Sequence, residues 1–219
     1  MLDFDPLTAA GIGLIAGFVA AMPGGPVNAT IVGEAARKGF RWALFVAAGA
    51  TVMEAGYCAA AFAGFAELFS TKWIRAAMEL ISFLLMVWLG VKYLRGTPLP
   101  GEERAERFVE VHFHPHTAFW TGFLRVLGNP GILLLWLTVS APLLGSGWVC
   151  DSSNCKWSFI GGAATGGFAW FLLLGWSVSR GVGRFSAATM GRLSTASGIL
   201  LLTVAAIVGS RLVMLLAKH

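Results

Sequence analysis

Charged side chains are scarce in this sequence. Asp, Glu, Lys and Arg make up 12% of its 219 residues, about half the share found in soluble domains. Hydrophobic residues make up 57%, and the mean hydropathy is +0.74. One soluble core cannot hide that much apolar surface. The composition therefore excludes a soluble domain and predicts an integral membrane protein.

Cysteine is also rare, with three residues in the chain. Cys150 and Cys155 bracket a short polar stretch between apolar segments, where an oxidising compartment would favour a disulfide. The C-x-x-C spacing that is more typical of a redox pair is missing. Cys58 stands alone on an Ala-rich segment, so we expect it to be a small apolar core residue.

Six apolar segments are long enough to cross a bilayer as helices, which takes about 20 residues each. The first does not look like a signal peptide, because Asp3 and Asp5 stand where positive charge is usual. We therefore predict an all-α integral membrane protein with six transmembrane helices. The segments run over Leu7–Ala36, Trp42–Phe69, Ile74–Leu94, Ala118–Leu144, Trp157–Val178 and Leu193–Ala217.

One long polar linker, residues 96–117, divides the chain into halves of three segments each, residues 1–95 and 118–219. An odd number of segments per half gives the halves opposite orientations, so any repeat is inverted. Five of the 16 basic residues lie on one side of the predicted membrane, namely Lys72, Arg75, Lys156, Arg211 and Lys218. The other side has 11, which predicts a cytoplasmic linker and external termini. The net charge of +5 thus reflects topology and indicates no nucleic-acid partner.

Two of the six segments are interrupted at matching places in the two halves. The first breaks at Pro23, Gly24, Gly25 and Pro26, and the fourth breaks at Gly128, Asn129, Pro130 and Gly131. A backbone break inside a bilayer costs several kcal/mol per unpaired group unless it is buried in protein or lines a water-filled cavity. Paired breaks in two halves predict a broken-helix binding site of the kind found in transporters.

Each break can start a new half-helix within the membrane. Pro26 and Pro130 suit the first position of a helix, and Asn129 suits its N-cap. Gly24 and Gly25 can adopt backbone angles that are closed to other residues. A helix N-terminus presents N–H groups and a positive dipole end, which suit a carboxylate. The alternative is two proline kinks that bind no ligand.

Glu54 lies well inside the second segment, counted from Trp42 at 1.5 Å per residue. An ionisable group at that depth is costly and is a functional candidate by default. It can exchange protons or pair with a substrate ammonium; the alternative is a permanently protonated carboxyl that is hydrogen-bonded to a neighbouring helix. Glu34, beside Arg37 and Lys38, is expected to form an interfacial ion pair.

Two further patterns have simpler interpretations. Small residues recur every four positions at Gly56, Ala60 and Gly64 and at Gly162 and Gly166, and such spacing predicts close helix contacts. His112, His114 and His116 alternate in the linker and could hold a metal. No cysteine or carboxylate completes an obvious ligand set, so a solvated linker is the alternative.

Several motifs together resemble the LysE (lysine exporter) superfamily of amino-acid efflux proteins. These are the run Pro23 to Asn28 with the basic turn Arg37-Lys38-Gly39, the run Gly49 to Glu54, Leu89-Gly90, and Gly122 to Leu124 with Asn129-Pro130. Three features depart from the family pattern. The first break has one glycine more than the usual Pro-Gly-Pro, Gly131 stands where a lysine is common, and the fourth helix has no second carboxylate.

The resemblance implies a transporter, not an enzyme, that exports an amino acid or similar small solute from a bacterium across its inner membrane, coupled to proton entry. It implies that the protein contacts membrane lipids and needs no cofactor. It leaves open whether the protein forms a homodimer. The substrate carboxylate would lie at the half-helix N-termini and its amine near Glu54. Asn28 and Asn129 would orient the substrate. The backbone of the site would come from Gly24, Gly25, Pro26, Gly128 and Pro130.

Three alternatives remain open from the residues themselves. A divalent-cation exporter would use Glu54 and the linker histidines, although Asn28 and Asn129 add few oxygen ligands. A membrane thiol oxidoreductase would need two cysteines that meet at mid-membrane, where only Cys58 is expected. A non-transporting subunit of an export machine could use the broken helices as a docking site.

Overall fold

The computed structural model describes residues 5–22, 25–68, 72–95, 118–145, 148–150, 152–181 and 187–217. Every regular element in these ranges is an α-helix. Pro23 and Gly24 of the first break lie outside the described residues. So does the predicted linker 96–117 with His112, His114 and His116. The predictions for these residues therefore stay predictions.

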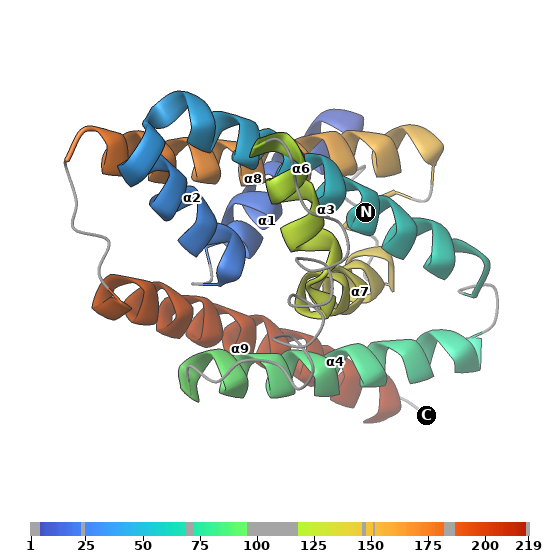
Figure 1. Ribbon diagram of the computed structural model, residues 1–219. Coiled ribbons are helices and arrows are strands. Elements are labelled where there is room, and N and C mark those ends of the chain that lie inside the picture. The colour runs from blue at the N-terminus through green and yellow to red at the C-terminus, as the bar shows by residue number, and fades with distance from the viewer. Residues whose placement is uncertain are drawn as a thin grey trace.

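The described residues form eight helices, and the six predicted apolar segments fall on them (Figure 1). Helix α8 begins earlier than the predicted Trp157, because Ser152 caps its N-terminus and accepts a hydrogen bond from Cys155 N. The bounds are α1 Pro6–Ala21, α2 Pro26–Lys38, α3 Phe40–Leu68, α4 Lys72–Arg95, α6 Ala118–Leu127, α7 Pro130–Gly145, α8 Ser153–Ser179 and α9 Ala187–Ala217.

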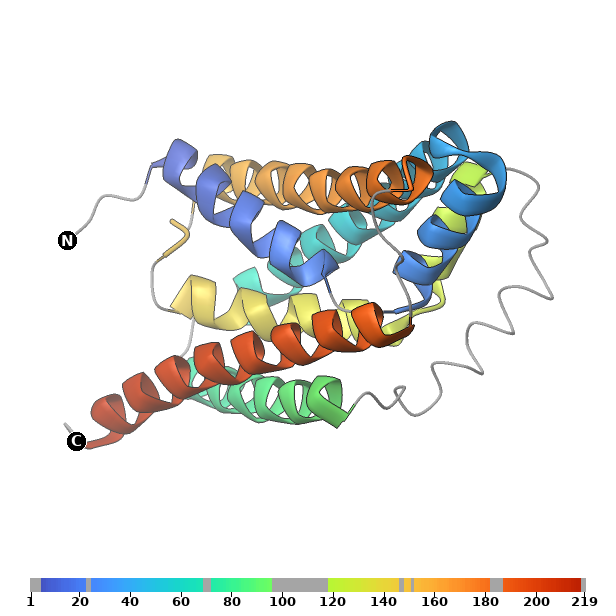
Figure 2. The ribbon, with the colours of Figure 1, turned by 90° about the vertical axis from the view of Figure 1, so that its left-hand side faces the viewer.

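Both predicted interruptions are breaks between helices. The axes of α1 and α2 differ by 77°, and those of α6 and α7 differ by 63°. Figure 2 shows α2 turning sharply away from the end of α1. Two of the described helices are long and apolar enough to cross a membrane alone, α3 over Phe40–Phe62 and α8 over Ser153–Ser179. Counting each bent pair as one span raises that number to four.

Glycines bring the helices into close contact at two crossings. At the crossing of α1 and α8, a Cβ added to Gly13 would overlap Phe159 O and press on Ala163 N. At the crossing of α3 and α6, a Cβ added to Gly122 would overlap Val46 O and press on Ala50 N. Only glycine leaves room for a neighbouring backbone at this separation, as small-residue packing in membranes requires.

The predicted small-residue contacts are confirmed on one helix and wrong on another. Gly162 and Gly166 of α8 lie against the backbone of α1, at Ala10 and Leu14. Gly56 of α3 faces open space, because α3 meets α6 two turns earlier, at Gly49 on the same side of the helix. The repeat of small residues alone could not show where along the helix a neighbour crosses.

The remaining long helices, α4 and α9, lie side by side at one edge of the molecule (Figure 1). Gly90 and Gly198 face each other at their contact. Large apolar side chains are exposed on helices throughout the described part of the chain, among them Leu7, Ile15, Val52, Leu84, Trp157 and Ile199. Such a surface suits hydrocarbon better than water.

The α1–α8 crossing provides a test of the packing. Gly17→Val should destabilise the protein by about 1–3 kcal/mol or more, because its Cβ would overlap the backbone of Ala163. Gly11→Ala on the same helix is the control, since a Cβ there meets nothing within 4 Å. The measurement is the melting temperature of the detergent-purified protein by size-exclusion chromatography. Equal melting temperatures for both variants and the wild type would contradict the close crossing.

Candidate functional site

Asn28, the third residue of α2, holds the first break together. Its side chain is 2% exposed. Its Nδ2 donates a hydrogen bond to Ala21 O, the last carbonyl of α1, at 2.9 Å. Its Oδ1 accepts from Trp170 Nε1 of α8 at 3.2 Å. The amide therefore ties the end of α1 and the start of α2 to α8.

The N-terminus of α2 has no side-chain cap. Gly25 is the N-cap residue, and Pro26 takes the first helical position, as predicted. Gly25 does not use the unusual backbone angles that are open to glycine, because its φ of −145° and ψ of −177° are ordinary extended values. What glycine supplies here is the absence of a side chain beside the first turn of the helix.

The second break is closed by different residues. Asn129 Oδ1 accepts a hydrogen bond from Gly131 N at 2.9 Å, which confirms the predicted N-cap of α7. Gly128 N donates to Leu124 O and ends α6. Pro130 is the first residue of α7. Tyr57 of α3 donates its hydroxyl to Leu127 O at 2.8 Å, so this final carbonyl of α6 also has a partner.

Glu54 is buried between three helices. It is 9% exposed and projects from α3. Its Oε2 lies against Gly167 of α8, where an added Cβ would be 3.1 Å away. That Cβ would also be 3.9 Å from the Cβ of Ala21, the last residue of α1. The Glu54 carboxyl thus lies on the side of α3 that faces the first break.

The Glu54 carboxyl makes no hydrogen bond or ion pair with the residues that the structure describes. Thr51, one turn earlier on α3, also buries a hydroxyl that lacks a described partner. Buried polar groups are usually paired, and leaving one unpaired costs about 1–3 kcal/mol. The described residues thus supply no donor of the kind that a purely structural role for Glu54 would require.

Helix α3 connects the two breaks. Glu54 and Tyr57 are one turn apart on it, and they face the first and second break respectively. One apolar cluster contains Ala21 and Val27 from the first break and Val126 from the second, with Ile132 of α7 packed against it. Both breaks therefore border the same part of the core.

Three residues of this region were not singled out in the sequence. Tyr57 follows Glu54 by one helical turn, which is a usable signal. Gly167 and Trp170 of α8 have no local signal, because their contacts with Glu54 and Asn28 join residues more than 100 positions apart.

The alternatives of a metal site and a redox site can be compared with the described His, Cys, Asp and Glu residues. Within the described residues, no three His, Cys, Asp or Glu side chains could together hold a metal ion. Cys150 and Cys155 form a disulfide with their Cα atoms 5.7 Å apart. Cys58 is buried, and its thiol is free. The divalent-cation alternative thus has no described ligand cluster at Glu54.

Comparison with known proteins gives two matches. The family model described as LysE type translocator matches residues 18–211. A protein of Bacillus subtilis (strain 168) named "Putative amino acid efflux protein YcgF" is 24% identical over 131 residues. That alignment covers 60% of this chain and 61% of the relative, so the chain matches less than two thirds of the relative's length. No solved structure matches the chain.

The matched family model extends over most of the chain and includes both breaks, Glu54, Tyr57 and the α8 residues that contact them. Together with the apolar helices, this match makes the chain a multi-pass membrane protein. It belongs to the LysE type translocator family.

Proposed function

We propose that this protein is a secondary transporter that exports an amino acid or a similar small solute from a bacterium across its inner membrane, in exchange for protons. The observation that carries the proposal is the buried carboxyl of Glu54 beside a broken helix, without a partner among the described residues. Family membership and the printed name of the Bacillus relative support the same function.

The proposed architecture is six spans in two inverted repeats, residues 1–95 and 118–219, joined by a cytoplasmic linker at 96–117. The two glycine crossings support it, because they use equivalent positions. Gly13 meets Phe159 and Ala163, and Gly122 meets Val46 and Ala50. Phe159 and Ala163 each lie 113 positions after Val46 and Ala50. The α1–α8 crossing therefore repeats the α6–α3 crossing, with α8 offset from α3 by 113 positions and Gly122 offset from Gly13 by 109.

The same offset relates the residues that contact the breaks. Moving 113 positions along the chain takes Tyr57 to Trp170 and Glu54 to Gly167. Tyr57 donates a hydrogen bond to Leu127 O at the second break, and Trp170 donates one to Asn28 Oδ1 at the first. Each aromatic residue thus ties its helix to a break. Glu54 and Gly167 face each other, and only one of the pair is acidic. In the proposed repeat, one half supplies the carboxyl and the other supplies the space for it.

The proposed site lies between the breaks, with its backbone formed by Gly24, Gly25, Pro26, Gly128 and Pro130. The substrate carboxylate binds at the uncapped N-terminus of α2, where N–H groups and the helix dipole favour an anion. Its ammonium pairs with the ionised carboxyl of Glu54. Asn28 and Asn129 shape the breaks in this proposal, because their side chains already bond to protein groups.

In this proposal, the Glu54 carboxyl binds either a proton or the substrate ammonium, but not both at once, and this couples the two. In the cytoplasm-facing state, the substrate ammonium displaces the proton from Glu54. In the outward-facing state, a proton from outside neutralises Glu54, and the substrate leaves. Each cycle then moves one proton inward and one substrate outward. The low dielectric of the buried site makes an ionised and unpaired Glu54 unfavourable, which disfavours return of the empty charged carrier.

Glu54→Gln should lose flux driven by a pH gradient in proteoliposomes, because the amide keeps its shape but cannot bind a proton reversibly. Glu54→Asp should keep partial flux, since it retains the carboxyl on a shorter arm. Glu34→Gln is the matched control, because Glu34 pairs with Arg37 and Lys38 instead of facing a break. The assay screens a panel of amino acids, with folding checked by size-exclusion chromatography.

Wild-type flux in Glu54→Gln would remove Glu54 from the coupling mechanism. Absence of flux in the folded wild type across the panel would favour the alternative of a non-transporting subunit.

The first break can be tested on α2 alone. Gly25→Leu should abolish transport while the protein stays folded, because the new side chain would cover the first turn of α2. Gly33→Leu on the same helix should transport normally, since a Cβ at Gly33 meets nothing within 4 Å. Substrate uptake is measured for both variants at equal amounts of protein in the membrane. Normal uptake by Gly25→Leu would reduce the break to a proline kink without a ligand.

A further inference from the structure

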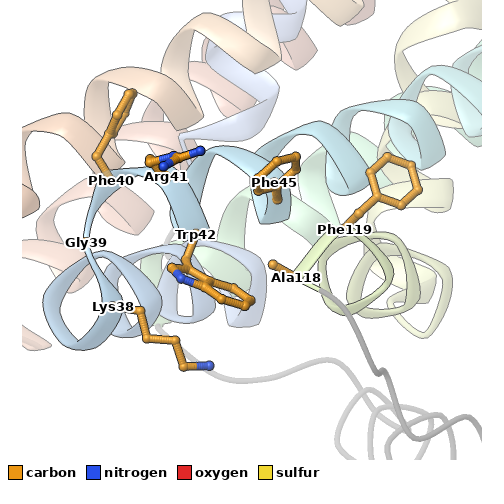
Figure 3. A pocket seen from close by; sticks show the side chains of 8 residues that line it. All are labelled: Lys38, Gly39, Phe40, Arg41, Trp42, Phe45, Ala118 and Phe119. Atoms are coloured by element: carbon orange, nitrogen blue, oxygen red, sulfur yellow. The ribbon is translucent and has the colours of Figure 1, made fainter.

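A pocket of about 850 Å³ lies where α2 turns into α3 and faces the start of α6 (Figure 3). Glu54 and the two breaks do not line it. Its volume is in the range of pockets that bind drug-sized ligands. It is lined by side chains from the turn, α3 and α6, namely Lys38, Phe40, Arg41, Trp42, Phe45, Ala118 and Phe119.

The turn places two cations beside this pocket. Gly39 has a φ of 85°, a left-handed value that favours glycine, and its N–H ends α2 by donating to Ala35 O. This reversal sets Lys38 at the last position of α2 and Arg41 in the first turn of α3. Lys38 Nζ is 4.9 Å from the centre of the Trp42 ring, within the range of a cation–π contact.

The charges around the turn are unbalanced. Glu34 forms ion pairs with Arg37 at 2.8 Å and with Lys38 at 2.9 Å. Arg41 makes no ion pair with any residue that the structure describes. The turn thus has one carboxylate and three cations, which leaves an excess positive charge of two.

The rest of the pocket is apolar. Trp42 and Phe45 are 45% and 54% exposed, and Phe119 faces them from α6. Figure 3 shows the aromatic rings following α3 away from the turn, toward the start of α6. The pocket thus has cations at one end and apolar walls along its length. A phospholipid has the complementary arrangement, with a phosphate at one end and acyl chains at the other.

We infer that this pocket binds an anionic phospholipid, with its headgroup at Lys38 and Arg41 and an acyl chain along Phe45 and Phe119. A small zwitterion would leave the aromatic walls uncovered. In the orientation proposed above, the turn lies at the cytoplasmic leaflet, where anionic lipids are drawn to basic residues. The inference uses the proposed orientation only to assign the leaflet, and binding is measured without transport.

Native mass spectrometry of the full-length protein, with phosphatidylglycerol or phosphatidylcholine added to the detergent, tests the inference. The wild type should retain phosphatidylglycerol in preference to phosphatidylcholine. Each basic residue near a membrane surface contributes about fivefold to binding of anionic lipid. Lys38→Gln/Arg41→Gln should therefore lose most of the preference, and Arg41→Gln alone should lose about fivefold.

Arg180→Gln is the matched control. Arg180 is an exposed arginine at the end of α8, 5.9 Å from the Trp176 ring centre, and it does not line the pocket. It should keep the wild-type preference. Phe45→Ala keeps both cations and removes one apolar wall, so it should weaken retention of both lipids without changing the preference. Equal retention of the two lipids by the wild type, or an equal loss in Arg180→Gln and Arg41→Gln, would overturn the inference.

Discussion

A helix that stops inside a bilayer leaves carbonyl and N–H groups that only other protein groups can satisfy. In the proposed topology this constraint acts twice, and described side chains meet it at both breaks. Asn28 bonds to the last carbonyl of α1, and Tyr57 bonds to the last carbonyl of α6. Asn129 caps the start of α7. The N-terminus of α2 is left without a side-chain cap, and there the proposed substrate carboxylate would complete the bonding.

The close helix crossings at glycine bring the hydrogen-bonding side chains near the two breaks. Because Gly13 lies against the α8 backbone, Trp170 of α8 can reach Asn28 beyond the end of α1. Because Gly122 lies against the α3 backbone, Tyr57 of α3 can reach Leu127. Larger residues at either crossing would move the bonding side chain away from its break. Close packing, satisfied breaks and the position of Glu54 therefore depend on one another.

Local chemistry in the sequence was enough to predict the breaks, the cap at Asn129 and the deep position of Glu54 within its segment. Proline, glycine and asparagine have strong positional preferences, and an acidic residue in an apolar segment stands out. The ion pairs of Glu34 also followed from short spacing. These features depend on residues close together in the chain, so the order of residues is sufficient to find them.

The partners across the fold could not be predicted in the same way. Trp170 and Asn28 are 142 positions apart, and Tyr57 and Leu127 are 70 apart. Such contacts depend on which helix faces are turned toward each other. The wrong prediction for Gly56 has a related cause, since the residue shares a helix face with Gly49 but lies two turns beyond the place where α6 packs. For Gly25, the freedom to adopt unusual backbone angles is not used, because its backbone is extended.

The proposed coupling depends on one carboxyl that exchanges a proton for a substrate. Proton release on substrate binding tests it most directly, using purified protein in weakly buffered detergent solution with a pH indicator, from acidic to alkaline conditions. At a pH where the empty wild type holds the proton on Glu54, binding should release about one proton per substrate, whereas Glu54→Gln should release none. Binding without proton release by the wild type at every pH, or equal release by Glu54→Gln, would contradict the account.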